Sequence, residues 1–308
     1  MQFQQTVAHR VSCEGIGLHR GQSVRMVISP APANSGIRFV RADLPARPMI
    51  RACYSQVVDT AMATTLGVPG ATLATVEHLL AALAGLGIDN ARVEVWGSEL
   101  PILDGSAAPF VALLQQAGVR TLRSPRIYCV IQQALEVVEG DKFIRVEPAS
   151  DPCFSYAIDF PHPLIGRQQV NFRMRPERFC REIAPARTFG FLKDVEALQA
   201  NGLALGGSLD NALVLTASGL MNPGGLRFAD EFVRHKLLDF IGDLALLGWP
   251  IHGHLQVVKG SHALHHRFME VLASHTQAWR LGIPGTLSTD RQPESGLSAP
   301  ARLKLALA

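Results

Sequence analysis

The sequence lacks the features that mark several large classes of protein. Its five cysteines are scattered and never spaced Cys-x-x-Cys, which argues against a disulfide framework and a thiolate zinc site. Lys and Arg never run beyond two in a row, so a nucleic-acid-binding face is not expected. No apolar signal segment opens the chain, and its longest apolar stretch, residues 79–88, is about half of a roughly 20-residue membrane span. We therefore expect a cytoplasmic protein with no integral membrane segment.

The composition is that of an ordinary soluble protein. The chain has 308 residues, of which 47% are hydrophobic and 18% charged, and this length suffices for two domains with separate cores. The net charge of +3 is a mild excess that favours an anionic small-molecule substrate.

The first part of the chain predicts an α+β domain over residues 1–125. Residues 2–39 alternate polar and apolar side chains between turn residues, which indicates antiparallel strands. A helix follows over residues 75–85, with Thr75 as its expected N-cap. A strand at 91–97 and a helix at 109–118 complete this unit.

The second part repeats this order of strands, helix, strand and helix, without a repeat at the level of residues. Residues 126–160 are predicted as strands, with a hairpin turn at 139–142. An apolar, glycine-rich insert at about 188–218 precedes a helix over 230–248. We expect a second α+β domain over 126–284, an active site between the two domains, and a flexible tail over 285–308 that is rich in Pro, Ser and Gly.

His235 and Asp239 lie one helical turn apart, opposite the apolar face of their helix. Zinc accepts imidazole nitrogen and carboxylate oxygen, and a catalytic zinc usually keeps three protein ligands. Glu77 and His78, in the first turn of the earlier helix, could supply a third ligand and a base. A solvated pair of His235 and Asp239 is the alternative. The zinc-protease motif H-E-x-x-H is absent from the sequence.

His262 is a candidate proton donor. Ser261 can cap the helix that follows residue 259, which puts His262 in the first turn, where the helix dipole lowers the pKa of an imidazolium. Asp243, on the same stripe as His235 and Asp239, could hold His262 charged and oriented. The alternative is a surface or capping histidine, since His265 and His266 lie nearby without an evident role.

Several motifs in order resemble one known family between Gln5 and about Trp279. They are TVEHLLAAL, PILDGSA, IDFPHP, APARTFGF, GGS-x-DNA, GLRFADEFVRHKLLDFIGDL and K-x-SHALHH, the last where the family tends to have S-G-H-A-L-N. The sequence is similar to the zinc-dependent UDP-3-O-acyl-N-acetylglucosamine deacetylases, which carry out the committed step of lipid A synthesis. It departs from them locally, with Ser261 in place of a glycine and His265 in place of an asparagine.

The resemblance implies a role for each matching residue. One zinc ion per chain would bind His78, His235 and Asp239, with Glu77 as base and His262, supported by Asp243, as the donor of a proton to the leaving amine. Thr188 would help to polarise the acetyl carbonyl. The implied substrate-binding residues are Lys236, Phe189 and Lys142, together with Phe191, Ala204 and Ser208 of the insert.

The sequence leaves alternatives open for the insert, the function, the metal and the oligomeric state. By pattern alone the apolar residues of the insert would enter the core, whereas the resemblance assigns the insert to a passage for the fatty acyl chain. Two alternative functions are compatible with the sequence. The protein could be a zinc deacetylase acting on another amino-sugar substrate, or a non-catalytic protein that binds a sugar nucleotide or an acyl chain. Iron(II) could also fit two histidines and one carboxylate. We expect a monomer, although nothing in the sequence fixes the oligomeric state.

Overall fold

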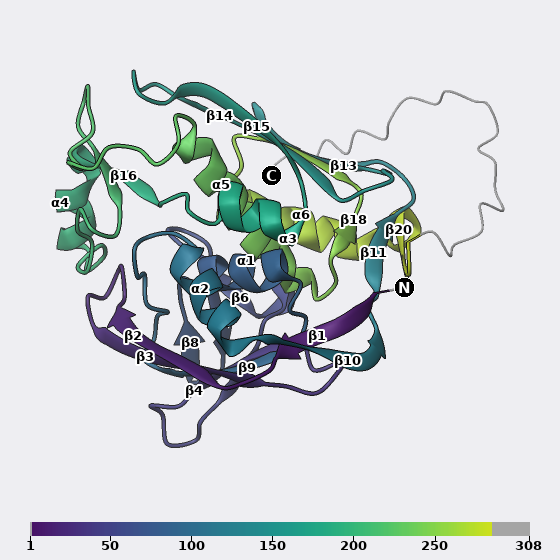
Figure 1. Ribbon diagram of the computed structural model, residues 1–308. Coiled ribbons are helices and arrows are strands. Elements are labelled where there is room, and N and C mark those ends of the chain that lie inside the picture. The colour runs from purple at the N-terminus through teal and green to yellow at the C-terminus, as the bar shows by residue number, and fades with distance from the viewer. Residues whose placement is uncertain (1, 285–308) are drawn as a thin grey trace, which may run out of the picture.

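The two halves of the chain stack as a sheet, a layer of helices, a second layer of helices and a second sheet (Figure 1). This computed structural model describes residues 2–284, and the predicted flexible tail, 285–308, lies outside them. The fold is α+β, as predicted.

The first sheet has the strand order β2-β3-β9-β4-β5, in which only β9 and β4 are parallel. Along β9 the apolar side chains are buried and alternate with more exposed polar ones, because successive side chains of a strand point to opposite faces. The helices of this half cover the apolar face. Its elements are β1 (Phe3–Val7), β2 (Val11–Ile16), β3 (Ser23–Pro30), β4 (Ile37–Arg41), β5 (Met49–Arg51), β6 (Val57–Asp59), β7 (Thr65–Val68), β8 (Ala71–Leu73), α1 (Glu77–Leu86), β9 (Ala91–Trp96), α2 (Ala108–Ala117) and β10 (Val119–Pro125).

The second sheet repeats this arrangement strand for strand. Its order is β12-β13-β19-β14-β15, and again only the third and fourth strands, β19 and β14, are parallel. The similar order of elements predicted for the two halves is confirmed. The elements are β11 (Tyr128–Ile131), β12 (Leu135–Glu139), β13 (Lys142–Glu147), β14 (Cys153–Phe160), β15 (Gly166–Arg173), α3 (Pro176–Arg178), β16 (Phe189–Phe191), α4 (Leu192–Ala200), β17 (Leu213–Leu215), α5 (Glu231–Leu244), β18 (Ile251–His252), β19 (His254–Val258), α6 (His262–Ser274) and β20 (Trp279–Gly282).

Two local predictions are wrong. Thr75 does not cap α1: Val76 is the N-cap, while Thr75 has a left-handed φ of 58° and its hydroxyl donates to Glu99 instead. The helix of the insert, α4, buries none of its residues, so the pattern-based placement of that helix in the core fails. We keep the boundary at 125/126 as a proposal, because β10 ends at Pro125 and the strands that follow join other sheets.

The helices α1 and α5 pack closely at the centre of the molecule (Figure 1). The apolar face of α5 turns toward the second sheet, where the Phe240 ring packs edge-on against Phe154 and Tyr156. On its other side α5 meets the start of α1. A Cβ on Gly242 would lie 2.0 Å from the carbonyl oxygen of Glu77, so only a glycine allows this approach.

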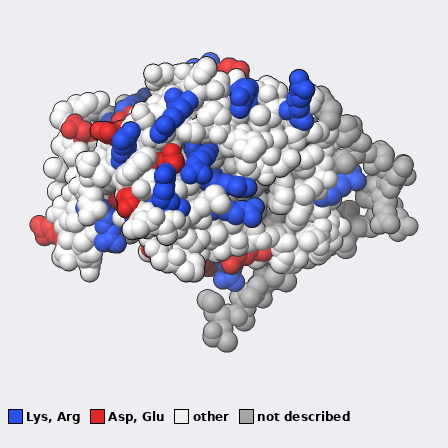
Figure 2. Space-filling view, turned by 90° about the horizontal axis from the view of Figure 1, so that it is seen from below, with Lys and Arg blue, Asp and Glu red and all other residues white. Residues whose placement is uncertain are grey.

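The outer face of the first sheet carries a row of arginines. Arg38 of β4 lies opposite Arg92 on one neighbouring strand and Arg51 on the other. Figure 2, which views the molecule from below Figure 1, shows basic side chains gathered on this side. Glu94 pairs with Arg47 and Arg92. Among residues 2–284, no helix is long and apolar enough to span a membrane.

Candidate metal centre and active site

Three potential metal ligands meet where α1 and α5 pack. His78 comes from the first turn of α1, and His235 and Asp239 come from consecutive turns of α5. One oxygen of Asp239, Oδ1, lies 3.5 Å from Nε2 of His78 and 3.3 Å from Nε2 of His235. All three side chains are buried. The alternative of a solvated His235–Asp239 pair is therefore wrong.

The three residues fit a zinc or iron(II) ion. Ligand atoms bound at roughly 2.0–2.2 Å around a tetrahedral ion are about 3.3–3.6 Å apart, which matches the separations found here. Nδ1 of His235 donates to the carbonyl oxygen of Ala186 at 3.1 Å, which leaves Nε2 with a free lone pair. Lys236 Nζ donates to Oδ2 of Asp239 at 2.7 Å and leaves Oδ1 available. Nδ1 of His78 is buried without a hydrogen-bond partner in the described chain.

The charges of these side chains also suit metal binding. Burial lowers the pKa of His235 to about 4, so its imidazole is neutral, as a metal ligand must be. Burial would raise the pKa of Asp239, but the neighbouring His235 and Lys236 outweigh it and hold that pKa well below its usual range. The carboxylate therefore stays ionised.

A second cluster of titratable groups, Asp243, His262 and His265, is held by hydrogen bonds. Nδ1 of His262 and Nδ1 of His265 each lie 2.7 Å from the same oxygen, Oδ2 of Asp243. These distances are typical of charge-assisted hydrogen bonds and are shorter than the spacing of ligands around one ion. Ser261 caps α6 as predicted, and His262 is its first residue.

The Asp243 carboxylate decides the charge of His262. Burial and the N-terminus of α6 both disfavour an imidazolium, but Asp243 outweighs them and raises the pKa of His262 to about 9. At neutral pH His262 therefore carries a proton that it can donate.

Thr64 links Glu77 to the second cluster, and nothing in the sequence predicted it. Its backbone N–H donates to Oε2 of Glu77 at 3.2 Å, and its hydroxyl donates to Oδ1 of Asp243 at 2.6 Å. A lone threonine in a loop forms no recognisable motif. Burial raises the pKa of Glu77, which makes this carboxylate a better proton acceptor than an exposed one.

Two of the predicted substrate-binding residues lie beside the ligands. The Phe189 ring is 6.3 Å from that of His235, and Lys236 bonds to Asp239. Thr188 comes directly before Phe189. Phe191 packs against Phe160 and His162, one step further from the ligands.

The other three predicted substrate-binding residues are Lys142, Ala204 and Ser208. Within residues 2–284, they make no hydrogen bond, ion pair or ring contact with His78, His235 or Asp239. Lys142 lies in the predicted hairpin and its Nζ is 3.9 Å from Glu139. Ala204 and Ser208 flank a loop of the insert that reaches the first half, where the backbone N–H of Leu205 donates to His19 and that of Gly206 donates to Leu18. The insert therefore bridges the two halves of the molecule.

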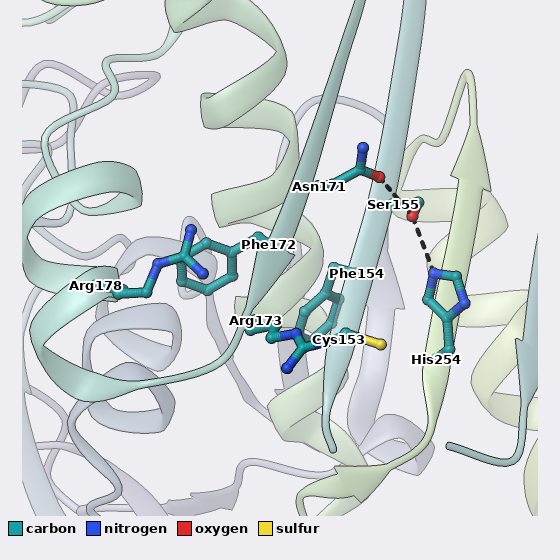
Figure 3. A pocket seen from close by; sticks show the side chains of 8 residues that line it. All are labelled: Cys153, Phe154, Ser155, Asn171, Phe172, Arg173, Arg178 and His254. Carbon is teal, nitrogen blue, oxygen red and sulfur yellow. Dashed lines mark hydrogen bonds between the residues drawn. The ribbon is translucent and has the colours of Figure 1, made fainter. Parts of the chain in front are cut away.

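A hollow of about 300 Å³ lies elsewhere, along β14, β15 and β19 (Figure 3). Ser155 lies between Asn171 and His254 there, at 2.8 Å and 2.9 Å. Because the Ser155 hydroxyl donates to Asn171, His254 acts as the donor to Ser155 and cannot activate it as a nucleophile. This hollow shares no residue with either cluster.

A buried set of two histidines and one carboxylate, with a further carboxylate and an imidazolium close by, is the arrangement used by metal-dependent hydrolases. Comparison with known proteins narrows this class. The model of the UDP-3-O-acyl N-acetylglycosamine deacetylase family matches residues 4–274, and the chain belongs to this family.

Individual relatives of this chain carry the name of the same family. The chain is 53% identical over 261 residues, 85% of each chain, to the UDP-3-O-acyl-N-acetylglucosamine deacetylase of Anaeromyxobacter sp. (strain Fw109-5). It is 51% identical to the protein of the same name from Anaeromyxobacter dehalogenans (strain 2CP-C), over 90% of each chain. It is also 51% identical to that from Myxococcus xanthus (strain DK1622), over 90% of this chain and 88% of the relative.

Proposed function

We propose that the protein is a cytoplasmic zinc-dependent deacetylase acting on UDP-3-O-acyl-N-acetylglucosamine. It hydrolyses the N-acetyl amide and releases acetate and UDP-3-O-acyl-glucosamine, the committed step of lipid A biosynthesis. The observation that carries the proposal is the buried His78–His235–Asp239 cluster, flanked by Glu77 and His262, in a chain 51–53% identical to relatives of that name.

His78, His235 and Asp239 hold one zinc ion per chain, which when bound supplies a Lewis acid for the acetyl carbonyl and for the attacking water. Glu77 accepts the proton of that water, and the N–H of Thr64 keeps its carboxylate in place. The hydroxyl of Thr188 helps to polarise the carbonyl. Lys236 holds Asp239 through a hydrogen bond and also contacts the substrate in this proposal.

His262 donates a proton to the departing nitrogen, because an amine anion is too basic to leave unprotonated. Asp243 keeps His262 charged and directs Nδ1 toward itself, so that Nε2 is free to face the substrate. A protonated His262 and an ionised Glu77 are the two states that the reaction needs together.

The substrate-binding residues form a second part of the proposal. Phe189, Phe191 and Lys142 contact the sugar nucleotide, and the insert around Ala204 and Ser208 lines the passage of the acyl chain. Supporting this role, Leu192, Leu205 and Leu209 of the insert are 42%, 52% and 39% exposed, which makes apolar surface available for an acyl chain. The protein acts as a monomer.

The test is acetate release by the purified, zinc-analysed protein. We expect one zinc per chain, turnover of the acylated substrate far above that of its deacylated counterpart, and loss of activity on exhaustive chelation. Equal turnover of the acylated and non-acylated sugar nucleotides would contradict the acyl passage. Preference for a different N-acetylated amino sugar would favour the alternative substrate.

A further inference from the structure

Asp243 receives more hydrogen bonds than a carboxylate needs to hold one histidine. Its Oδ1 accepts from the Thr64 hydroxyl, and its Oδ2 accepts from both His262 and His265. His262 and His265 are three residues apart on α6, so both rings face α5. Proton transfer to a substrate does not explain the buried His265, because both of its ring nitrogens are engaged, Nδ1 with Asp243 and Nε2 with Tyr156.

Tyr156 fixes the tautomer of His265. The carboxylate of Asp243 requires Nδ1 of His265 to carry hydrogen, so Nε2 of the neutral ring is an acceptor. The buried Tyr156 hydroxyl lies 3.2 Å from that Nε2 and donates to it. Burial lowers the pKa of His265, which agrees with a neutral ring.

The backbone next to α6 leaves room for this contact. A Cβ on Gly260 would lie 2.3 Å from the Tyr156 hydroxyl and 2.7 Å from Nε2 of His265. Any other residue at 260 would displace one of the two groups. The chain Tyr156–His265–Asp243–His262 is therefore continuous, and every member except His262 is fully enclosed.

We propose that His265, oriented by Tyr156, is a positioning residue that locks the Asp243 carboxylate in the orientation that His262 needs. The inference rests on the proposed function, in which His262 is the proton donor. Thr64 and His262 alone would leave one hydrogen bond on each oxygen of Asp243, and His265 adds a second donor to Oδ2 from another direction, which further restricts rotation about the Cβ–Cγ bond. His265 acts only through Asp243.

Two substitutions of nearly equal size separate the hydrogen bond from the packing. Asn has its Nδ2 the same number of bonds from Cα as Nδ1 of His, so His265→Asn keeps a donor for Asp243 and loses the link to Tyr156. His265→Leu removes the donor. Tyr156→Phe removes only the hydroxyl that orients His265.

The experiment measures kcat, KM and zinc content for the full chain and these variants. We expect His265→Leu to lower kcat by about ten- to a hundredfold, as for loss of a hydrogen bond to a charged group, with KM and zinc unchanged. His265→Asn should restore most of kcat. Tyr156→Phe should lower kcat in the wild-type background and have no further effect in His265→Asn.

An NMR measurement tests the positioning role of His265 independently of the proposed function. Nitrogen-edited NMR should show strongly hydrogen-bonded Nδ1 protons of His262 and His265, and His265→Leu should shift or broaden that of His262. If wild type releases no acetate but this change occurs, the proposed function fails and the positioning stands. An unchanged His262 resonance, or wild-type kcat in both His265→Leu and Tyr156→Phe, would overturn it.

Discussion

Asp239 and Glu77 are both buried carboxylates, but their neighbours give them different properties. Asp239 lies against two imidazoles and the Lys236 ammonium, which keep it ionised. The carboxylate of Glu77 accepts a hydrogen bond from the backbone N–H of Thr64, and burial raises the pKa of Glu77. The first is suited to holding a cation and the second to exchanging a proton.

Asp239→Ala should therefore lose zinc, whereas Glu77→Gln should retain it. The Glu77→Gln protein should lose about a hundredfold to ten-thousandfold in kcat, the usual contribution of a general base. Metal analysis after dialysis and an acetate-release assay check both. Equal zinc loss in the two variants would mean that Glu77 is itself a ligand.

The pH dependence of kcat/KM should reflect His262. Its pKa is raised to about 9, so the imidazolium persists at neutral pH and kcat/KM should fall as the pH rises above about 9. Asp243→Asn removes the charge that raises this pKa, so the fall should begin at lower pH. A pH–rate series on both proteins measures this shift.

The control for this series is His262→Ala, which should keep zinc and lose most of its maximal rate. If Asp243→Asn left the basic limb in place and His262→Ala turned over normally, Glu77 would have to carry both proton transfers.

Sequence reasoning identified the residues that stand in recognisable patterns. The stripe of His235, Asp239 and Asp243 follows from helical spacing, and Glu77 and His78 are neighbours in the first turn of their helix. The structure brings His78 together with His235 and Asp239, and Asp243 together with His262. Thr64 and Tyr156 were missed because their hydroxyls bond to residues far away in the sequence, Asp243 and His265, and neither stands in a recognisable motif. His265 was seen but given no role, since its partner Asp243 lies on another helix.

Among the elements, the contact of α1 with α5 sets the spacing of the proposed ligands, because His78 belongs to one helix and His235 and Asp239 to the other. Gly242→Ala would place a methyl group against the carbonyl oxygen of Glu77 and force the two helices apart. We expect the free energy of unfolding to fall by about 1–3 kcal/mol and zinc affinity to fall about tenfold or more.

Thermal melts and chelator competition measure these two effects. Gly224→Ala is the matched control, because a Cβ there meets nothing within 4 Å and its φ is ordinary. Wild-type zinc affinity in Gly242→Ala would show that the ligands adapt to the separation.

Helices and strands were predictable where periodicity was strong, as in α5 and β9, and the hairpin between β12 and β13 followed from its turn residues. The structure of the insert at about 188–218 was harder to predict from the sequence. Its apolar residues gave the pattern of a core helix, yet no residue of α4 is buried, because a periodic pattern does not say which surface an apolar face meets. Nor could Thr75 be recognised as a partner of Glu99, a contact made across 24 residues.

At the scale of the whole molecule, the two sheets have the same strand order and the same senses of pairing. The sequence showed this only as a repeated order of elements, since no residues repeat. The parallel pairs β4–β9 and β14–β19 could not be foreseen, because each joins strands far apart in the chain.

Removing the metal should lower the melting temperature. An ion that binds only the folded chain stabilises it by about 4 kcal/mol at a free concentration 1,000 times its Kd, which corresponds to a shift on the order of 10 °C. Calorimetry with and without chelator checks this. Asp239→Ala should show no shift, and a shift of equal size in that variant would point to another ion site.

Because the three proposed ligands are divided between the two halves, zinc affinity should depend on how closely the halves pack. Coupling free energies are reciprocal, so whatever the ion contributes to docking, docking contributes to the ion's affinity. Gly85 of α1, where a Cβ would come within 2.2 Å of the Phe179 ring, lies outside the ligand set but belongs to this contact. A zinc titration can therefore report on a packing defect that touches no ligand.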